Sequence, residues 1–440
     1  MPHVALVPLV GFRFREPQMA ELGMSLPGLR RRAKAVGELP ALGLLTLAGA
    51  TPEPWTCSYQ PLPGEERLEE FFAQVMDARP TLVALSALTA SAPLAYRLAQ
   101  RLRAAGLPTV IGGLHATVCP DEAGRHCDAV VLGPGEYVWP QLLRDAAAGR
   151  LQPIYDARGR TAEAWPLPRF ELLGPRVPRY TLQTQRGCPL ACEFCGASRL
   201  LGPFCEKPLA KIRQELQAIA ALDPEPVIEL ADDNTFAGSR DAEALLGALA
   251  EADARYFTEA DWRIGERPEL LRRLAASGCA QVLVGLESLV FRYPGMGAKQ
   301  AELERMMAAA TAIQEAGVVV NGCFILGADG ETNASIDRLV EFVLASPLAE
   351  VQLTLETPFP GTRLYERLSR AGRLLPDRGW EAYTLFDATF APDRITAAEL
   401  EAGFRRAVAA VFSPAATARR AEIRRRVWRN NRRLVKEANT

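Results

Sequence analysis

The sequence lacks the features that would assign it to several common classes of protein. It contains three histidines among 440 residues, and its formal net charge is −1. A near-neutral charge gives no global indication of a nucleic-acid or membrane partner. No apolar run is long enough to span a bilayer, and residues 1–8 predict a strand rather than a signal peptide. Hydrophobic residues make up 48% of the chain, enough for two domains with separate cores.

Cysteines are few, but three of them are grouped. The total of nine is odd and shows no disulfide-like pairing, which favours the reducing cytoplasm. Cys188, Cys192 and Cys195 form a Cys-x3-Cys-x2-Cys motif after a predicted strand. Three thiolates on one tight loop can ligate three irons of a 4Fe–4S cluster and leave the fourth iron open to a small molecule. The alternatives are inert core thiols or a zinc site, although no second pair of zinc ligands follows.

Short apolar segments alternate with helical ones in two stretches of the chain. Residues 1–150 predict a doubly wound, Rossmann-like α/β domain, and residues 151–179 are interpreted as a linker. Residues 180–375 contain six strand–helix repeats, which predict a partial (β/α)6 TIM-like barrel with its chemistry at the carboxyl ends of the strands. Residues 376–440 are expected to be mostly helical. We expect their basic end to dock on the body through its few apolar residues rather than to bind nucleic acid.

Polar residues and a glycine follow the predicted barrel strands. Asp232 and Asp233 follow the second strand, Glu287 and Ser288 the fourth, and Gly327 the fifth. Carboxylates at a barrel rim can accept hydrogen bonds from an ammonium group or from ribose hydroxyls. Each polar residue could instead cap a turn.

Together these segments resemble the cobalamin-dependent branch of the radical S-adenosylmethionine (SAM) superfamily, in which SAM binds the open iron of the cluster. The resemblance spans about residues 1–395 and includes Gly-Leu-Glu-Ser at 285–288 and Pro-Phe-Pro-Gly-Thr at 358–362. It implies that Glu287 and Ser288 lie near the ribose and carboxylate of SAM. It also implies that Asp232 and Asp233 lie near the SAM amino group or the substrate. Gly327 would allow close approach of the adenine or the methionine chain of SAM, and Phe194 could shield the cluster or offer its backbone to a ligand.

The N-terminal motifs resemble the cobalamin-binding domain of the same branch. The resemblance implies that cobalamin is bound by the following residues: Ser86, Thr89, Gly112, Gly113, His115, Gly135 and Glu136. Glycines at a strand end admit a bulky corrin side chain or nucleotide tail against the backbone. Gly112 and Gly113 could alternatively form only a tight turn, and His115 could be a structural histidine.

The scarcity of histidine bears on the cobalt ligand. Many corrinoid proteins ligate cobalt from below through an Asp-x-His-x-x-Gly motif, and none of His3, His115 and His126 lies in one. The resemblance therefore implies cobalamin in its base-off, His-off form, in which Co(I) is more accessible.

The resemblance implies an enzyme, and we expect a methyltransferase. It would move a methyl group from SAM, through methylcobalamin, to an unactivated carbon or phosphorus centre by means of a 5′-deoxyadenosyl radical. The substrate would be a small molecule or a peptide, and a flavodoxin or ferredoxin would supply electrons. One alternative is a radical rearrangement, ring contraction or cyclisation without methyl transfer. Another is a non-catalytic cobalamin or cluster sensor that binds nucleic acid through the basic tail.

Overall fold

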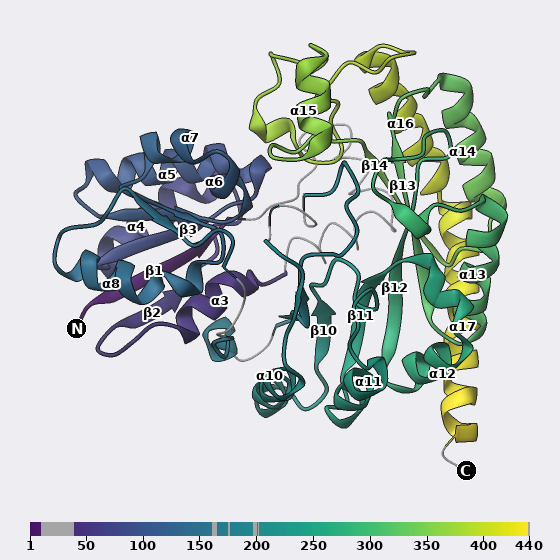
Figure 1. Ribbon diagram of the computed structural model, residues 1–440, viewed down its shortest axis with the longest axis horizontal. Coiled ribbons are helices and arrows are strands. Elements are labelled where there is room, and N and C mark those ends of the chain that lie inside the picture. Colours follow the sequence, from purple (N-terminus) through teal and green to yellow (C-terminus); the bar gives the residue numbers. More distant parts are fainter. Residues whose placement is uncertain (10–38, 161–164, 175–176, 197–199, 201, 439–440) are drawn as a thin grey trace.

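The computed structural model describes residues 1–9, 39–160, 165–174, 177–196, 200 and 202–438, with side chains described as far as residue 431. The chain forms two lobes, each built on a parallel sheet (Figure 1). We call residues 1–156 the N-terminal lobe and residues 177–438 the C-terminal lobe.

The sheet of the N-terminal lobe has the strand order β2-β1-β3-β4-β5-β6. Its strands are β1 (His3–Pro8), β2 (Thr56–Tyr59), β3 (Leu82–Ser86), β4 (Thr109–Gly112), β5 (Ala129–Leu132) and β6 (Ile154–Asp156). β6 lies in the segment interpreted as a linker, so the first sheet continues past residue 150. The order reverses beside β1, and such a point in a doubly wound sheet opens a ligand crevice at the strand ends.

Alternation of side chains in β1 explains why helices cover both faces of this sheet. Ala5 and Val7 join a core with helices α4 (Leu68–Ala78), α5 (Ala92–Ala104), α6 (Leu114–Val118) and α7 (Pro120–His126). Val4 and Leu6 join a second core with α3 (Leu42–Gly49) and α8 (Trp139–Ala147). Successive strand residues point to opposite faces, so each core takes every second residue. The predicted doubly wound fold is confirmed.

The C-terminal lobe contains six parallel strands in sequential order, which confirms the predicted partial barrel. They are β7 (Tyr180–Leu182), β10 (Val227–Leu230), β11 (Arg255–Ala260), β12 (Cys279–Glu287), β13 (Val319–Leu326) and β14 (Glu350–Leu355). The helices between them are α10 (Leu209–Leu222), α11 (Ala242–Glu251), α12 (Pro268–Ala276), α13 (Leu303–Glu315) and α14 (Asn333–Ala345). β7 and β14 are the two edge strands, so the barrel is open.

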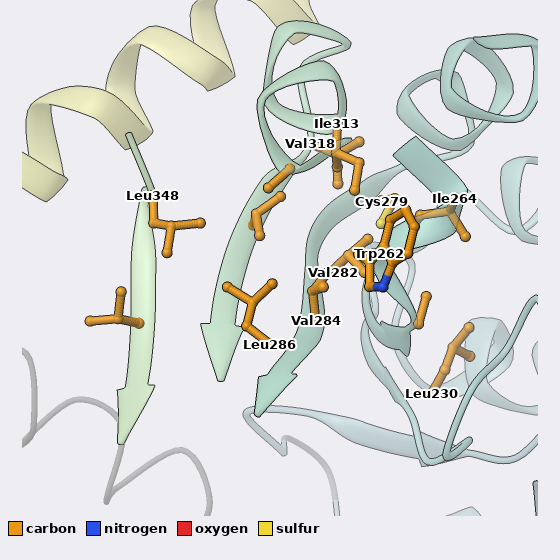
Figure 2. Close-up of a cluster of buried hydrophobic side chains, with 14 of the residues drawn as sticks. Leu230, Trp262, Ile264, Cys279, Val282, Val284, Leu286, Ile313, Val318 and Leu348 are labelled. Atoms are coloured by element: carbon orange, nitrogen blue, oxygen red, sulfur yellow. The ribbon is translucent and has the colours of Figure 1, made fainter. Parts of the chain in front are cut away.

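The two faces of this sheet differ in polarity. Val282, Val284 and Leu286 of β12 are buried with Ile313 of α13 in the large apolar core (Figure 2). The alternate positions of the strands are more polar and less buried, and include Glu229, Glu259, Gln281, Cys323 and Gln352. The apolar face therefore binds the helices, and the polar face lines the inside of the open barrel.

Three helices complete the chain: α15 (Arg363–Arg370), α16 (Ala397–Val411) and α17 (Pro414–Ala438). Ile423 and Val427 of α17 are buried against Val319 and Ala349, at the amino ends of β13 and β14. Asn431 donates a hydrogen bond to the carbonyl of Ala275 at 3.2 Å. The prediction that the basic tail docks on the body is confirmed. No helix among the described residues is long and apolar enough to cross a membrane.

Candidate active site

A cavity of about 290 Å³ lies between the two lobes. Five of the predicted cofactor residues line it at the carboxyl ends of β3, β4 and β5: Ser86, Gly112, Gly113, Gly135 and Glu136. From the C-terminal lobe it is lined by Gln183, Arg186, Leu200 and Ala231. The cavity therefore occupies the crevice that a doubly wound sheet offers to ligands, and the barrel closes its opposite side.

Gly113 shapes one wall of this cavity. Its φ is +103°, which disfavours any side chain, and a Cβ there would lie 3.1 Å from the carbonyl oxygen of Ala87. A Cβ at Gly135 would lie 3.4 Å from atoms of Leu47 and Val131. The remaining wall is mainly apolar. At these glycines, the amide or nucleotide groups of a cofactor could lie against bare backbone.

Thr89 and His115 are not among the described residues that line the cavity. They are buried together, with His115 Nδ1 3.4 Å from the Thr89 hydroxyl. His115 Nε2 lies 3.6 Å from a carboxylate oxygen of Glu122, and the indole N–H of Trp380 donates to that carboxylate at 2.9 Å. Burial lowers the pKa of His115, although Glu122 acts in the opposite direction. His115 thus belongs to a contact between the lobes.

The cysteine loop begins directly after β8 (Gln185–Arg186) and is anchored on the loop after β12. The amides of Ala191 and Glu193 donate to the carbonyls of Gly295 and Pro294 at 3.1 and 3.0 Å. Cys192 is buried beside Tyr293, Met296 and Ala328, and Phe194 meets Tyr293 edge to face at 4.6 Å. The loop is therefore fixed on the barrel side of the interface, with Cys192 buried and Cys188 and Cys195 partly exposed.

The chemistry of the three thiols fits a cluster. None of the nine cysteines, all of which lie among the described residues, forms a disulfide. Burial raises the pKa of Cys192 to about 11, with Lys299 opposing and the charges of Cys195, Glu287 and Cys188 adding. Among the described residues, no three His, Cys, Asp or Glu side chains are already arranged around a common metal position. Ligation would therefore require the thiols to close around the cluster.

Glu193, between the second and third cysteines, anchors the loop to α15. Arg367 donates to both of its carboxylate oxygens, at 3.0 and 3.2 Å, and to Asp329 at 2.6 Å. The amide of Leu364 also donates to the carbonyl of Glu193 at 3.0 Å. The sequence analysis did not identify this network, because its members lie far apart in the chain and form no motif.

The two adjacent carboxylates after β10 have different surroundings. Asp232 is buried and accepts hydrogen bonds from the amide and hydroxyl of Thr184 at 2.7 and 2.5 Å, and from Gln185 and Thr235 at 3.1 Å. It therefore holds the strand that leads to the cysteine loop. Burial, together with the charge of Asp232, raises the pKa of Asp233 to about 6.

Glu259 on β11 is a second carboxyl of this region, and no sequence motif marked it. Burial, reinforced by the charges of Asp233 and Glu229, raises its pKa to about 8, with Lys299 opposing. Like Glu229, it belongs to the more polar alternate positions of the strands. The inside of the barrel near the cysteine loop thus carries carboxyl groups that hold their protons more strongly than ordinary ones.

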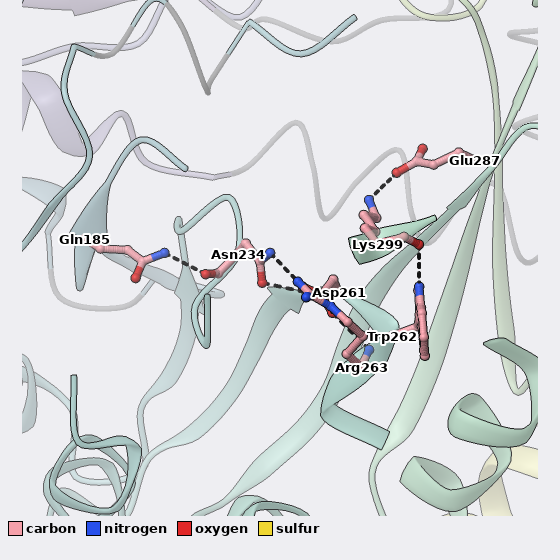
Figure 3. Close-up of polar contacts among 7 residues, drawn as sticks. All are labelled: Gln185, Asn234, Asp261, Trp262, Arg263, Glu287 and Lys299. Atoms are coloured by element: carbon pink, nitrogen blue, oxygen red, sulfur yellow. Dashed lines mark hydrogen bonds and ion pairs between the residues drawn. The ribbon is translucent and has the colours of Figure 1, made fainter. Parts of the chain in front are cut away.

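Glu287 forms a buried ion pair with Lys299 (Figure 3). β12 shifts register between Gly285 and Glu287, and Glu287 has a φ of +62°, so the strand end bends. A Cβ at Gly285 would lie 2.6 Å from Lys299 Nζ, so this glycine leaves space for the lysine. The indole N–H of Trp262 donates to the carbonyl of Lys299 at 2.7 Å, as Figure 3 also shows.

Ser288 and Gly327 have structural contacts in addition to their predicted roles. The Ser288 hydroxyl accepts hydrogen bonds from the amides of Val290 and Phe291, both at 3.2 Å. Gly327 has a φ of +98°, and a Cβ there would lie 2.7 Å from Leu400 of α16. The glycine is therefore needed for helix packing, whether or not it also borders a ligand.

Comparison with known proteins agrees with this arrangement. Residues 31–143 match the B12 binding domain family, and residues 182–343 match the radical SAM superfamily. The chain is 25% identical over 360 residues to a bacteriochlorophyllide d C-12(1)-methyltransferase of Chlorobaculum tepidum, covering 79% of this chain and 78% of the relative.

Two solved structures share the fold. The methyltransferase TsrM from Kitasatospora setae, with cobalamin and a [4Fe-4S] cluster bound, superposes with a TM-score of 0.64 at 15% identity and full coverage of both chains. The radical enzyme OxsB, with aqua-cobalamin and SAM bound, gives a TM-score of 0.65 at 14% identity. That match covers 93% of this chain and 66% of OxsB, so the present chain spans about two thirds of the longer enzyme.

The fold and site define a two-domain radical enzyme with a corrinoid-binding lobe and an iron–sulfur lobe. The chain belongs to the cobalamin-dependent radical SAM family. The predicted cofactors, namely cobalamin, SAM and a 4Fe–4S cluster, are confirmed at the level of the family.

Proposed function

We propose that the protein is a methyltransferase that moves a methyl group from SAM to an unactivated carbon, or to phosphorus, in a small molecule or peptide. The observation that carries this proposal is the shared cavity, which has cobalamin-motif residues on one wall and Arg186, two residues before Cys188, on the other. A substrate in this space would meet both cofactors. The methyltransferase named among its relatives supports methyl transfer as the reaction.

The residues that would hold the cofactors follow from the two walls. Cys188, Cys192 and Cys195 would ligate the cluster, and Ser86, Gly112, Gly113 and Gly135 would contact cobalamin. No histidine is among the described residues that line the cavity, which supports the His-off form. When bound, the cluster and cobalamin supply the electron that cleaves SAM and the carrier for its methyl group.

Asp233 is a better candidate than Asp232 for contact with the SAM ammonium group or the substrate. Asp232 already accepts four hydrogen bonds within the protein. The charge of Asp233 contributes to the raised pKa of Glu259, and Lys299 pairs with Glu287 at the end of β12. We propose that Glu287 and Ser288 contact the ribose and carboxylate of SAM from this position.

The reaction also needs a source of single electrons. We propose a reduced flavodoxin or ferredoxin as the donor, because several residues of the cysteine loop are partly exposed, where a small carrier protein could approach the cluster. Anaerobic turnover driven by a purified flavodoxin, compared with turnover driven by dithionite, would test this assignment.

Anaerobic turnover with reconstituted protein tests the proposed reaction. Candidate substrates are incubated with methyl-labelled SAM, and the products are analysed by mass spectrometry. A product that gains one labelled methyl group supports methyl transfer. A product that forms with 5′-deoxyadenosine but without label would instead establish a rearrangement or cyclisation. Cys192→Ala is the control and should form neither 5′-deoxyadenosine nor product.

A further inference from the structure

Arg186 and Glu136 form a buried ion pair that joins the two lobes beside the cavity. Arg186 Nη1 lies 2.8 Å from Glu136 Oε1, and the side chains are 14% and 6% exposed. Both residues line the cavity. Glu136 ends the Gly-Pro-Gly-Glu segment of the N-terminal lobe, and Arg186 ends β8 immediately before Gly187 and Cys188. One interaction therefore connects a cobalamin-motif segment with the start of the cluster loop.

Arg186 is held firmly on the C-terminal lobe. β8 pairs antiparallel with β9 (Cys205–Glu206), and Arg186 lies opposite Cys205. The guanidinium stacks over the ring of Trp165 at 5.0 Å, and Lys207 Nζ lies 5.1 Å from the same ring. Lys207 is itself paired with buried Glu215 at 2.7 Å. A displacement of Arg186 would therefore disturb the root of the cluster loop.

Glu136 is held equally well on the N-terminal lobe. It lies in the short helix η3 (Gly135–Tyr137), which is separated from the end of β5 by two residues. Gly133, three residues before Glu136, is held in place. Its amide donates to the Thr117 hydroxyl at 3.1 Å, and a Cβ there would lie 2.9 Å from the backbone nitrogen of Arg158. The backbone segment that carries Glu136 is thus tied to the sheet whose strand ends form the cavity wall.

Stability alone does not account for a charged pair at this position. Burying two charges costs desolvation energy, and apolar residues of similar volume are often as stable. What an ion pair adds is a defined geometry between its partners. We infer that Arg186 and Glu136 are positioning residues that fix the cluster loop against the cobalamin site, so that binding of one cofactor favours binding of the other. This inference rests on the proposed function only in placing both cofactors on one chain.

The test is a linkage measurement on Glu136→Gln. Cobalamin is titrated by absorbance into full-length protein without a cluster and with a reconstituted cluster. In the wild type the cluster should tighten cobalamin binding by about fivefold or more, and in the variant this factor should fall to about one. The second readout is the ratio of 5′-deoxyadenosine to methylated product, which should rise in the variant because SAM cleavage and methyl delivery are less well aligned.

A second variant and a matched control distinguish a loss of linkage from a general loss of stability. Arg186→Lys retains the positive charge but loses the planar guanidinium, and should lower the linkage factor in the same direction. Glu350→Gln breaks the partly buried pair with Arg424 at the opposite end of the barrel and should leave the factor unchanged. Equal linkage in the wild type, Glu136→Gln and Arg186→Lys would overturn the inference, as would an equal loss in Glu350→Gln. Wild-type protein that binds no cobalamin would instead refute the proposed function.

Discussion

The guanidinium of Arg367 on α15 joins Glu193 of the cysteine loop to Asp329 of the loop after β13. Glu193 is 4% exposed and immediately follows Cys192, so its position determines where the loop backbone runs. Arg373 also binds Asp329, at 2.7 Å, and donates to the carbonyl of Ala391 at 2.8 Å. The cluster loop is thus supported from α15 and from the segment beyond it, as well as from the barrel.

Arg367→Lys should weaken retention of the cluster. A lysine cannot form the two-point contact with Glu193 while also reaching Asp329. Replacing a residue that supports a metal ligand without touching the metal costs about 10-fold or more in metal affinity or activity. Iron and sulfide content after anaerobic reconstitution and desalting measures the effect. Arg370→Lys on the same helix, where the arginine is 80% exposed and pairs with Glu366, should retain a wild-type cluster. Equal iron content in both variants would show that the network does not support the loop.

Substitution of any of the three loop cysteines should abolish the cluster, whereas substitution of the other cysteines should not. The cluster absorbance should be lost in each of three variants: Cys188→Ala, Cys192→Ala and Cys195→Ala. A cluster held by only three thiolates needs all of them to stay bound. Cys279→Ala should keep it, since Cys279 is 2% exposed in the apolar core and burial raises its pKa to about 12. Cys205→Ser is a closer control, because Cys205 lies in β9 opposite Arg186. Loss of the cluster in Cys205→Ser would add a fourth thiol to the site and contradict the assignment.

Glu356 should make the cofactor-free protein less stable as the pH rises. It is 2% exposed, and burial raises its pKa from about 4.5 to about 8, although Tyr293 and Arg367 act in the opposite direction. The folded protein then retains a proton that the unfolded chain has released. The free energy of unfolding should therefore fall between about pH 5 and about pH 8.

Glu356→Gln should reduce this dependence and exceed the wild type in stability at about pH 8 by roughly 2–4 kcal/mol. Thermal unfolding of both proteins without cofactors, at about pH 6 and about pH 8, measures the difference. The same slope with pH in both proteins would exclude Glu356 as its source.

Gly113→Ala should weaken cobalamin binding without unfolding the N-terminal lobe. The new Cβ would require a disfavoured φ and would press against the carbonyl of Ala87 and the hydroxyl of Ser86 at 3.1 and 3.4 Å. The expected strain is about 1–3 kcal/mol, shared between stability and the shape of the cavity wall. Gly124→Ala in α7 is the matched control, because its Cβ would meet only a methyl group of Val130 at 3.9 Å. Absorbance titration with cobalamin should separate the two variants, and equal affinities would remove Gly113 from the site.

The fold was predictable because both sheets leave strong local patterns. Buried strands such as β3 and β13 are visible in the sequence as apolar runs between helical segments. The alternation of strands and helices then predicts a parallel sheet. β6 was missed because Ile154–Asp156 is a short edge strand within a Pro- and Arg-rich segment. Its place depends on pairing with β5, which no local pattern encodes.

The candidate site was predictable only where residues form motifs. Gly112, Gly113 and Glu136 do line one cavity, whereas Thr89 and His115 share their segments but point into a buried contact between the lobes. Glu259 and Arg367 were missed because their significance depends on what the fold places beside them. Arg186 lies next to the cysteine motif in the sequence, but its partner Glu136 is 50 residues away.

A single-turnover experiment with methyl-deuterated SAM tests the two-cofactor account most directly. Wild-type protein is loaded with cluster and cobalamin, reduced anaerobically and quenched, and the corrinoid and nucleoside fractions are analysed by mass spectrometry. The account predicts deuterated methyl on the corrinoid before any substrate is added, and 5′-deoxyadenosine together with loss of that label from the corrinoid once substrate is present. Fully loaded protein that forms 5′-deoxyadenosine while all the label stays in methionine and SAM would contradict it.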